Sequence, residues 1–153
     1  MMQESIFLYC QLSFIQVKKL KNLPLDKQLL DNLTQQAKAS PRLRMNFDLR
    51  NSPEDTSQRM LNAIEPGSEV PIHRHQKTSE TVVVLRGRVI EEYYDELERI
   101  CEATYEISPE GPIMALNIPA GQWHTLRSLE SGTVILEVKD GAYEPIKECD
   151  ILK

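Results

Sequence analysis

The sequence contains only three histidines, and their spacing suits metal binding. His73 and His75 are separated by one residue, so in an extended segment both imidazoles would point to the same side. Glu80 follows after a polar stretch long enough to turn the chain, and His124 comes just after a Pro- and Gly-containing turn at residues 119–121. Divalent transition metals accept imidazole and carboxylate ligands. The pattern therefore predicts a metal site made by His73, His75, Glu80 and His124.

Each part of this pattern also has an ordinary structural explanation. A single histidine is usually a hydrogen-bonded or surface residue, and a His-x-His pair by itself is more often structural than metal-binding. Cysteine offers no competing metal site, because Cys10, Cys101 and Cys149 are far apart and form no C-x-x-C pair. Their odd number also argues against a disulfide framework. A site built from imidazoles must draw on nearly the whole supply of three histidines.

Composition indicates a single domain and excludes several kinds of partner. A chain of 153 residues with 41% hydrophobic content forms one core. The net charge is −5 and the basic residues are scattered, which argues against nucleic acid or an anionic membrane as the main partner. The apolar run at residues 6–17 is shorter than the ~20 residues that span a bilayer, and no positive charge precedes it as in a secretory signal. We therefore expect a cytoplasmic protein with a small-molecule ligand.

The expected secondary structure changes in character along the chain. Leucines at helical spacing follow Asp26, which suits an N-cap, and predict a helix over residues 26–39. The polar stretch 50–57 shows no hydrophobic periodicity and predicts a loop. Short β-rich runs at spacings near ten residues then predict an antiparallel sandwich or small barrel. The expected strands are residues 59–65, 79–85, 88–94, 100–107, 114–118, 123–129 and 133–139.

The candidate ligands also fit a known pair of motifs. The first is Gly67, His73-x-His75, Glu80 and Gly87, and the second is Pro119-x-Gly121-x-x-His124. Together they resemble the two motifs of the cupin superfamily, in which three His and one Glu bind a divalent metal inside a β-barrel. Two positions depart from the pattern: Gly111 lies farther from Pro119 than usual, and Ser128 replaces the closing Asn. Neither supplies a metal ligand.

This resemblance implies a mainly β fold. We expect a cupin-type antiparallel β-barrel (double-stranded β-helix or jelly roll) with one N-terminal α-helix. Residues 1–22 would be an N-terminal extension, either a strand or poorly ordered, and residues 23–153 a single cupin domain. The usual cupin arrangement implies a homodimer.

Longer segments are similar to one group, the WbuC-type cupin fold metalloproteins. Members of that group are bacterial and are associated with surface-polysaccharide gene clusters, and their reaction is not established. The resemblance therefore implies a role in polysaccharide biosynthesis without a defined chemistry. It covers about residues 24–145, through segments 39–44, 58–67, 71–75, 80–88, 118–125 and 129–139.

These observations lead to one main hypothesis and two alternatives. The main hypothesis is a metal-dependent enzyme, such as an isomerase or epimerase, that acts on a sugar or sugar nucleotide through one divalent ion per chain (Fe, Mn, Zn, Ni or Co). The alternatives are a non-catalytic metal-dependent binding or regulatory module and an iron-dependent dioxygenase. Four protein ligands leave an octahedral ion two open positions, whereas a tetrahedral zinc would be closed. Candidate catalytic helpers are Arg59, Asn62, Lys77 and Arg88, each of which could equally be a surface or structural residue.

Overall fold

The computed structural model of the chain describes residues 22–97 and 99–153, so the extension expected over residues 1–22 lies almost wholly outside the described residues. Within them one α-helix precedes eight β-strands, and a 3-10 helix follows the last strand. No helix in this part of the chain is long and apolar enough to cross a membrane. The bounds are α2 (Lys27–Ala39), β1 (Arg44–Asp48), β2 (Ser57–Ile64), β3 (Glu80–Arg86), β4 (Val89–Tyr94), β5 (Cys101–Ile107), β6 (Ala115–Ile118), β7 (Trp123–Ser128), β8 (Thr133–Asp140) and η1 (Glu148–Asp150).

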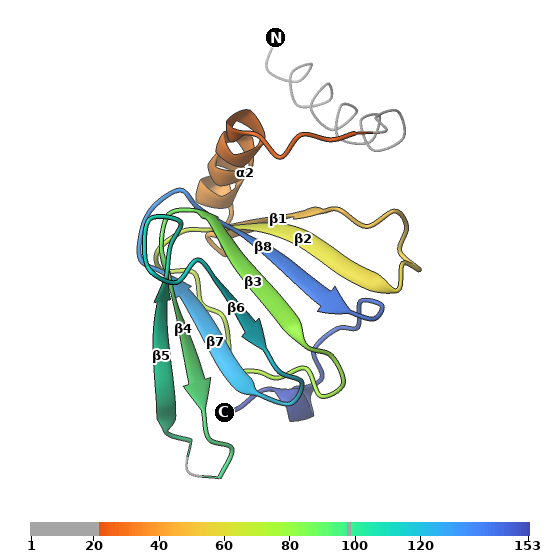
Figure 1. Ribbon diagram of the computed structural model, residues 1–153, viewed down its shortest axis with the longest axis vertical. Coiled ribbons are helices and arrows are strands. Elements are labelled where there is room, and N and C mark those ends of the chain that lie inside the picture. Colours follow the sequence, from red (N-terminus) through yellow and green to blue (C-terminus); the bar gives the residue numbers. More distant parts are fainter. Residues whose placement is uncertain (1–21, 98) are drawn as a thin grey trace.

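The strands form two antiparallel sheets that face each other (Figure 1). The larger sheet has the order β1-β2-β8-β3-β6, and the smaller has the order β5-β4-β7. Consecutive strands such as β3 and β4, or β7 and β8, lie in different sheets, which is the jelly-roll arrangement expected from the sequence. The ladders of the described strands do not join the two sheets, so the barrel is open at its edges.

The predicted helix and all seven predicted strands are confirmed to within two residues. The side chain of Asp26 accepts a hydrogen bond from the backbone N–H of Leu29 at 2.9 Å, as an N-cap should. Strand β1 has no counterpart among the predicted strands. Only Met45 and Phe47 alternate with polar residues there, and an alternation this short does not identify a strand. Strand β1 forms because its whole length pairs with β2.

Two apolar clusters hold the layers together. Between the sheets, Val82 and Val84 of β3 pack with Val89 and Ile107 from the smaller sheet. On the outer face of the larger sheet, α2 buries one side against β2 and β8 (Figure 1). The second cluster comprises Leu30, Leu33, Ala37, Leu61, Ala63 and Val134. Strand β2 therefore contributes side chains to both clusters, because successive side chains of a strand point to opposite faces of the sheet.

The inner face of the larger sheet changes from apolar to polar along its strands. The apolar half contains Ile64 of β2 and Ile135 of β8, both buried. At the other half, Gln58 pairs in register with Lys139, and Lys139 is in turn opposite Glu80 of β3. The fold thus places buried polar side chains at one end of the space between the sheets.

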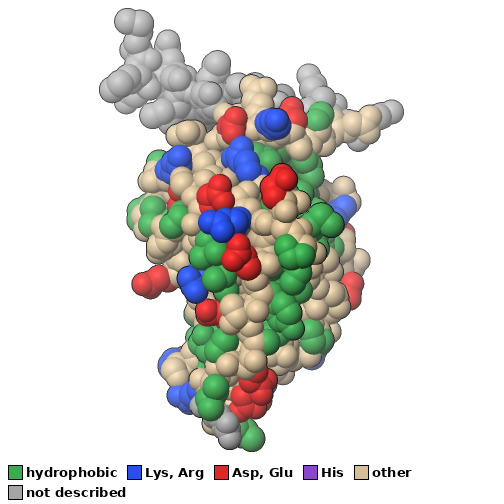
Figure 2. Space-filling model, turned by 60° about the vertical axis from the view of Figure 1, so that its left-hand side comes forward, with side chains coloured by type: hydrophobic (Ala, Val, Ile, Leu, Met, Phe, Trp, Pro, Cys, Tyr) green, Lys and Arg blue, Asp and Glu red, His purple; other side chains and the backbone are tan. Residues whose placement is uncertain are grey.

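Charges on the outside are mixed. On the side that carries β5 and β4, acidic and basic side chains alternate with apolar ones and form no single basic patch (Figure 2). This distribution agrees with the scattered basic residues of the sequence.

The turn between β3 and β4 offers a test of the packing. Gly87 has φ +80°, and a Cβ there would lie 2.2 Å from Thr133 Oγ1 and 2.7 Å from Thr133 Cα. Gly132 has the same backbone conformation at φ +84°, but its nearest neighbour, Arg86 Nε, is 3.9 Å away. We expect both Gly→Ala changes to cost about 1 kcal/mol for the left-handed backbone, and Gly87→Ala to cost a further ~1–3 kcal/mol for the clash. Urea unfolding of both variants measures this difference, and equal losses would contradict the described packing.

Candidate metal centre

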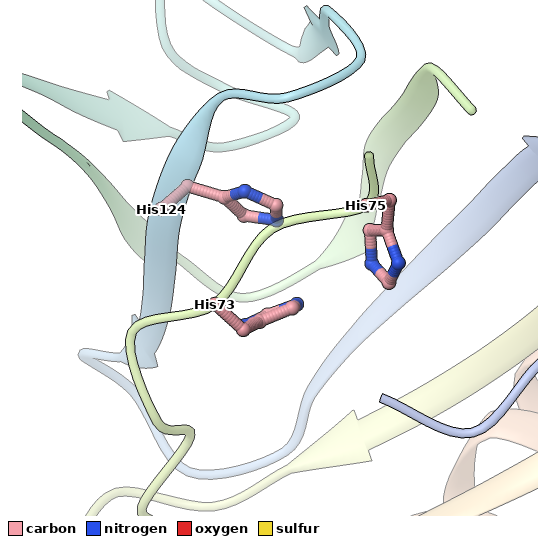
Figure 3. A group of neighbouring side chains, drawn as sticks. All are labelled: His73, His75 and His124. Carbon is pink, nitrogen blue, oxygen red and sulfur yellow. The ribbon is translucent and has the colours of Figure 1, made fainter. Parts of the chain in front are cut away.

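The three histidine side chains converge at the polar end of the barrel (Figure 3). One ligand-capable nitrogen from each of His73, His75 and His124 lies within 4.8 Å of the others. His124 belongs to β7, and the other two lie on the segment that connects β2 to β3. The extended arrangement expected for His73 and His75 forms no regular strand: this segment makes isolated bridges at His73, one of them to His124.

Backbone and ring hydrogen bonds fix the orientation of two imidazoles. The backbones of His73 and His124 exchange two N–H to carbonyl hydrogen bonds of 2.9 Å each. Ring atom Nδ1 lies 2.9 Å from the carbonyl oxygen of Pro71 in His73, and 2.9 Å from that of Gln122 in His124. A carbonyl can only accept, so Nδ1 carries the proton and Nε2 keeps its lone pair. This is the arrangement that orients metal-ligating histidines.

Glu80 completes the cluster from the first position of β3. Its Oε2 lies 3.2 Å from His75 Nε2 and 3.9 Å from His124 Nε2. The first of these contacts is not aligned as a hydrogen bond, so both His75 Nε2 and Glu80 Oε2 are buried without a hydrogen-bond partner among the described residues. Two such atoms facing each other would cost about 1–3 kcal/mol each if nothing satisfied them.

The electrostatics of the cluster favour the protonation states that bind metals. Burial, together with the neighbouring His124, lowers the pKa of His73 to about 4. Burial also lowers the pKa of His124. Burial would raise the pKa of Glu80, but contact with His75 and the charge of Lys139 outweigh it and hold that pKa at about 2. At neutral pH His73 and His124 are therefore neutral imidazoles and Glu80 is a carboxylate, all beside the ring of His75. These groups, two of them with unsatisfied atoms, fit a divalent cation.

A cavity of about 440 Å³ opens onto the cluster and is bordered by His73 and His75. Its inner wall contains a polar network centred on Glu137 of β8. Gln58 Nε2 donates to Glu137 Oε1 at 3.3 Å, and Asn62 Nδ2 donates to Glu137 Oε2 at 3.2 Å. Lys139 forms an ion pair with Glu137 and lies 3.5 Å from Glu80 Oε2. Burial and the charge of Glu80 raise the pKa of Glu137.

The structure brings only part of the predicted helper set to this cavity. Asn62 lines it, and Lys77 lines a smaller neighbouring cavity of about 230 Å³. Arg59 instead forms an ion pair with Asp55 at 2.7 Å and lines neither cavity. Arg88 is half exposed between Glu106 and Glu130, at 3.1 and 3.2 Å, and also lies away from both cavities.

The residues that sequence reasoning missed are Gln58, Glu137 and Lys139. The register places Gln58 opposite Lys139, and Glu137 opposite Met60. The sequence feature that could have identified Glu137 and Lys139 is the alternation of β8, in which polar residues follow Ile135 at inward-facing positions. Their convergence with Glu80 depends on pairing with β3, which local sequence does not reveal.

Known proteins provide an independent comparison. A family model described as a domain of unknown function (DUF6016) matches residues 25–105, more than half of the 153 residues. The chain belongs to this family. The DUF6016 match includes three of the four clustered side chains, His73, His75 and Glu80, and ends before His124. No curated protein matches the sequence.

Solved structures show that this DUF6016 chain has the cupin fold. CapF, the capsular polysaccharide assembling protein from Staphylococcus aureus, aligns with a TM-score of 0.55 and 20% identity over 65% of this chain, which spans only 29% of the CapF chain. A cupin 2 domain-containing protein from Halorhodospira halophila aligns with a TM-score of 0.53 and 16% identity, over 68% of each chain. KdgF from Halomonas sp. aligns with a TM-score of 0.52 and 16% identity, over 68% of this chain and 84% of its own. The WbuC subtype remains a prediction.

The C-terminal segment holds the histidine segment on the side away from β7. The backbone N–H of Arg74 donates to the carbonyl of Asp150 at 3.1 Å, and that of Leu152 donates to Ile72 at 2.8 Å. The carboxylate of Asp150 accepts from Arg74 Nε at 3.1 Å and from Gln76 Nε2 at 2.5 Å. The site therefore depends on the end of the described chain as well as on the cupin motifs.

This anchoring can be tested at Asp150. We expect Asp150→Ala to lower the unfolding free energy by about 1–3 kcal/mol, because it removes two side-chain hydrogen bonds to the histidine segment, and to weaken metal binding. Glu148→Ala is the matched control, since Glu148 pairs only with the exposed Lys153. Thermal unfolding and titration with Co²⁺ or Zn²⁺ measure both effects. An equal or larger loss in Glu148→Ala would contradict the anchoring role.

A buried carboxyl group lies behind the site. Glu91 of β4 is fully buried, and neither of its carboxyl oxygens has a hydrogen-bond partner among the described residues. Burial raises its pKa from 4.5 to about 9, and the charges of Glu80 and Glu137 contribute. Glu91 is therefore a neutral acid at pH 7 in the folded protein.

This protonation state has a measurable consequence. Between pH 4.5 and about 9 the unfolded chain releases the Glu91 proton while the folded chain keeps it, so the unfolding free energy falls as pH rises. Glu91→Gln cannot ionise. We expect the unfolding free energy of Glu91→Gln, relative to that of wild type, to increase with pH across this window. The increase should be on the order of a few kcal/mol by pH 8. Urea unfolding of chelator-treated protein at several pH values tests this, and a pH-independent difference would contradict it.

Proposed function

We propose that the chain binds one divalent metal ion through His73, His75, Glu80 and His124 and acts as a metal-dependent enzyme on a sugar or sugar nucleotide. The observation that carries the proposal is the convergence of three imidazoles and one buried carboxylate at the edge of an open cavity. A purely structural metal site needs no cavity of this size. Small-molecule sites have comparable volumes, from ~300 Å³ upward.

The residues of the cluster have distinct tasks in this proposal. The carbonyls of Pro71 and Gln122 hold the rings of His73 and His124 with Nε2 toward the centre. Glu80 supplies the negative charge that balances a cation. A bound divalent ion supplies Lewis-acid polarisation of a substrate carbonyl or hydroxyl oxygen.

The cavity wall suits a hydroxylated ligand and a proton transfer. The amide nitrogens of Gln58 and Asn62 donate to Glu137, which leaves their amide oxygens as acceptors for substrate hydroxyls. All three histidines belong to the proposed ligand set, so proton transfer falls to another group. Burial and the charge of Glu80 raise the pKa of Glu137, which favours its protonated form and suits a carboxyl group that exchanges a proton with a substrate.

The biological setting in the proposal comes from resemblance. The WbuC-type segments support a cytoplasmic bacterial homodimer in surface-polysaccharide biosynthesis. The fold shared with CapF, described as a capsular polysaccharide assembling protein, supports the same setting by analogy.

Metal content tests the ligand set directly. We expect wild-type protein to hold one divalent ion per chain by elemental analysis, and Glu80→Gln and His124→Ala to lose at least about tenfold in metal affinity. Glu106→Gln, which changes a half-exposed carboxylate paired with Arg88, is the control and should retain wild-type metal content. Unchanged metal binding in both ligand variants would contradict the site.

Catalysis requires a second measurement. Metal-loaded protein should convert at least one nucleotide sugar, with the loss of turnover in His124→Ala following its loss of metal. Turnover unaffected by His124→Ala would overturn the enzyme proposal. A large chelator-induced fall in melting temperature without chemistry on any nucleotide sugar would instead favour the non-catalytic binding module.

A further inference from the structure

Two arginines border the same cavity as the histidine cluster. Arg42 and Arg44 lie just before and at the start of β1, and both line the 440 Å³ cavity together with His73 and His75. Neither guanidinium forms an ion pair with a carboxylate of the described residues, although most other arginines in that part of the chain do. Two arginines without a carboxylate partner among the described residues stand out in a chain of net charge −5. Both residues line a space that a ligand can enter.

The positive charges of the two arginines also act on each other. Partial burial lowers the pKa of Arg44, and the positive charge of Arg42 lowers it further. Arg44 Nη1 donates to the backbone carbonyl of Glu69 at 3.0 Å, which positions the group while leaving its charge unbalanced. Like charges repel, and an anion bound by both arginines would offset the repulsion.

The backbone between the arginines is constrained. Leu43 has φ +54°, a left-handed conformation that is unfavourable for a non-glycine residue. Hydrogen bonds hold it there: its N–H donates to Ser40 O, and its carbonyl accepts from Glu65 N, both at 2.9 Å. The hydroxyl of Ser68 donates to the carbonyl of Arg42 at 2.9 Å. The arginine pair therefore rests on a backbone fixed by several contacts.

Polar residues connect the arginine pair to the candidate metal centre. Asn46 pairs in register with Asn62, and both line the cavity between Arg44 and the network around Glu137. One continuous cavity thus has the two arginines at one end and the imidazole cluster at the other. Two acidic side chains, Glu137 and Glu144, also line this cavity, and Glu137 is already matched by Lys139.

We infer that Arg42 and Arg44 form a subsite for an oxyanion group of the substrate, a phosphate or a carboxylate, so that the ligand is an anionic sugar derivative. This inference rests on the proposed function and adds the charge and orientation of the substrate to it. Guanidinium groups bind phosphate and carboxylate through paired, charge-assisted hydrogen bonds. With its oxyanion on the arginines, the ligand directs a hydroxyl or carbonyl group toward His73 and His75.

The test compares three probes by calorimetric titration in phosphate-free buffer: glucose 1-phosphate, glucuronate and uncharged glucose. We expect at least one of the two anions to bind wild-type protein at least tenfold more tightly than glucose. The preferred anion identifies whether the subsite takes phosphate or carboxylate. Equal binding of all three probes would overturn the inference.

Variants assign the binding to the arginine pair. Arg42→Ala and Arg44→Ala should each raise the Kd of the preferred anion at least tenfold without changing metal content. Arg44→Lys should keep part of the affinity, because it retains the charge and loses the paired geometry. Arg127→Ala removes an exposed arginine charge elsewhere and should stay within twofold of wild type. Wild-type anion affinity in both Arg42→Ala and Arg44→Ala would overturn the inference, and Arg44→Lys covers the case in which an alanine variant fails to fold.

Failure of the inference and failure of the proposed function give different results. If the arginine variants bind anions normally while Glu80→Gln loses metal, the subsite is wrong and the metal centre stands. If anion binding depends on the arginines but wild-type protein takes up no metal, the subsite stands and the metal-dependent function fails.

Discussion

The negative charge of Glu80 is the constraint around which this end of the barrel is organised. The residue is 5% exposed, so water does little to stabilise its carboxylate. Close contact with His75 and the nearby charge of Lys139 hold it ionised despite burial. Lys139 in turn forms an ion pair with Glu137, and Glu137 accepts hydrogen bonds from the side-chain amides of Gln58 and Asn62 in β2. In the polar half of the barrel, the charges of Glu80, Lys139 and Glu137 thus stabilise one another.

The backbone makes this arrangement possible. Strand β3 places Glu80 at its first position, and β8 lies beside it with Lys139 directly opposite. The histidines reach the same point from two other segments, which pair through His73 and His124. A buried carboxylate whose partners lie on several segments needs a fold that brings these segments together. Two facing sheets do so.

The two ends of the cavity differ in a way that is informative about ligands. At the end that carries the histidine cluster, charges of both signs are present and largely matched. At the other end, Arg42 and Arg44 are held by backbone contacts but lack carboxylate partners among the described residues. Charges that the protein itself leaves unmatched mark where a ligand supplies the counter-charge.

Local sequence by itself determined the helix, seven of the strands and the identity of the clustered side chains. These features depend on short-range periodicity, capping at Asp26 and spacing within two motifs, all of which act within a few residues. Only the tertiary structure decided the rest: the short strand β1, the inward network of Gln58 and Glu137, the arginine pair at the cavity, and the support of the histidine segment by the C-terminus. Each of these arises from contacts between segments far apart in the chain. Strand order and register set such contacts, and neither is encoded in the period of any single strand.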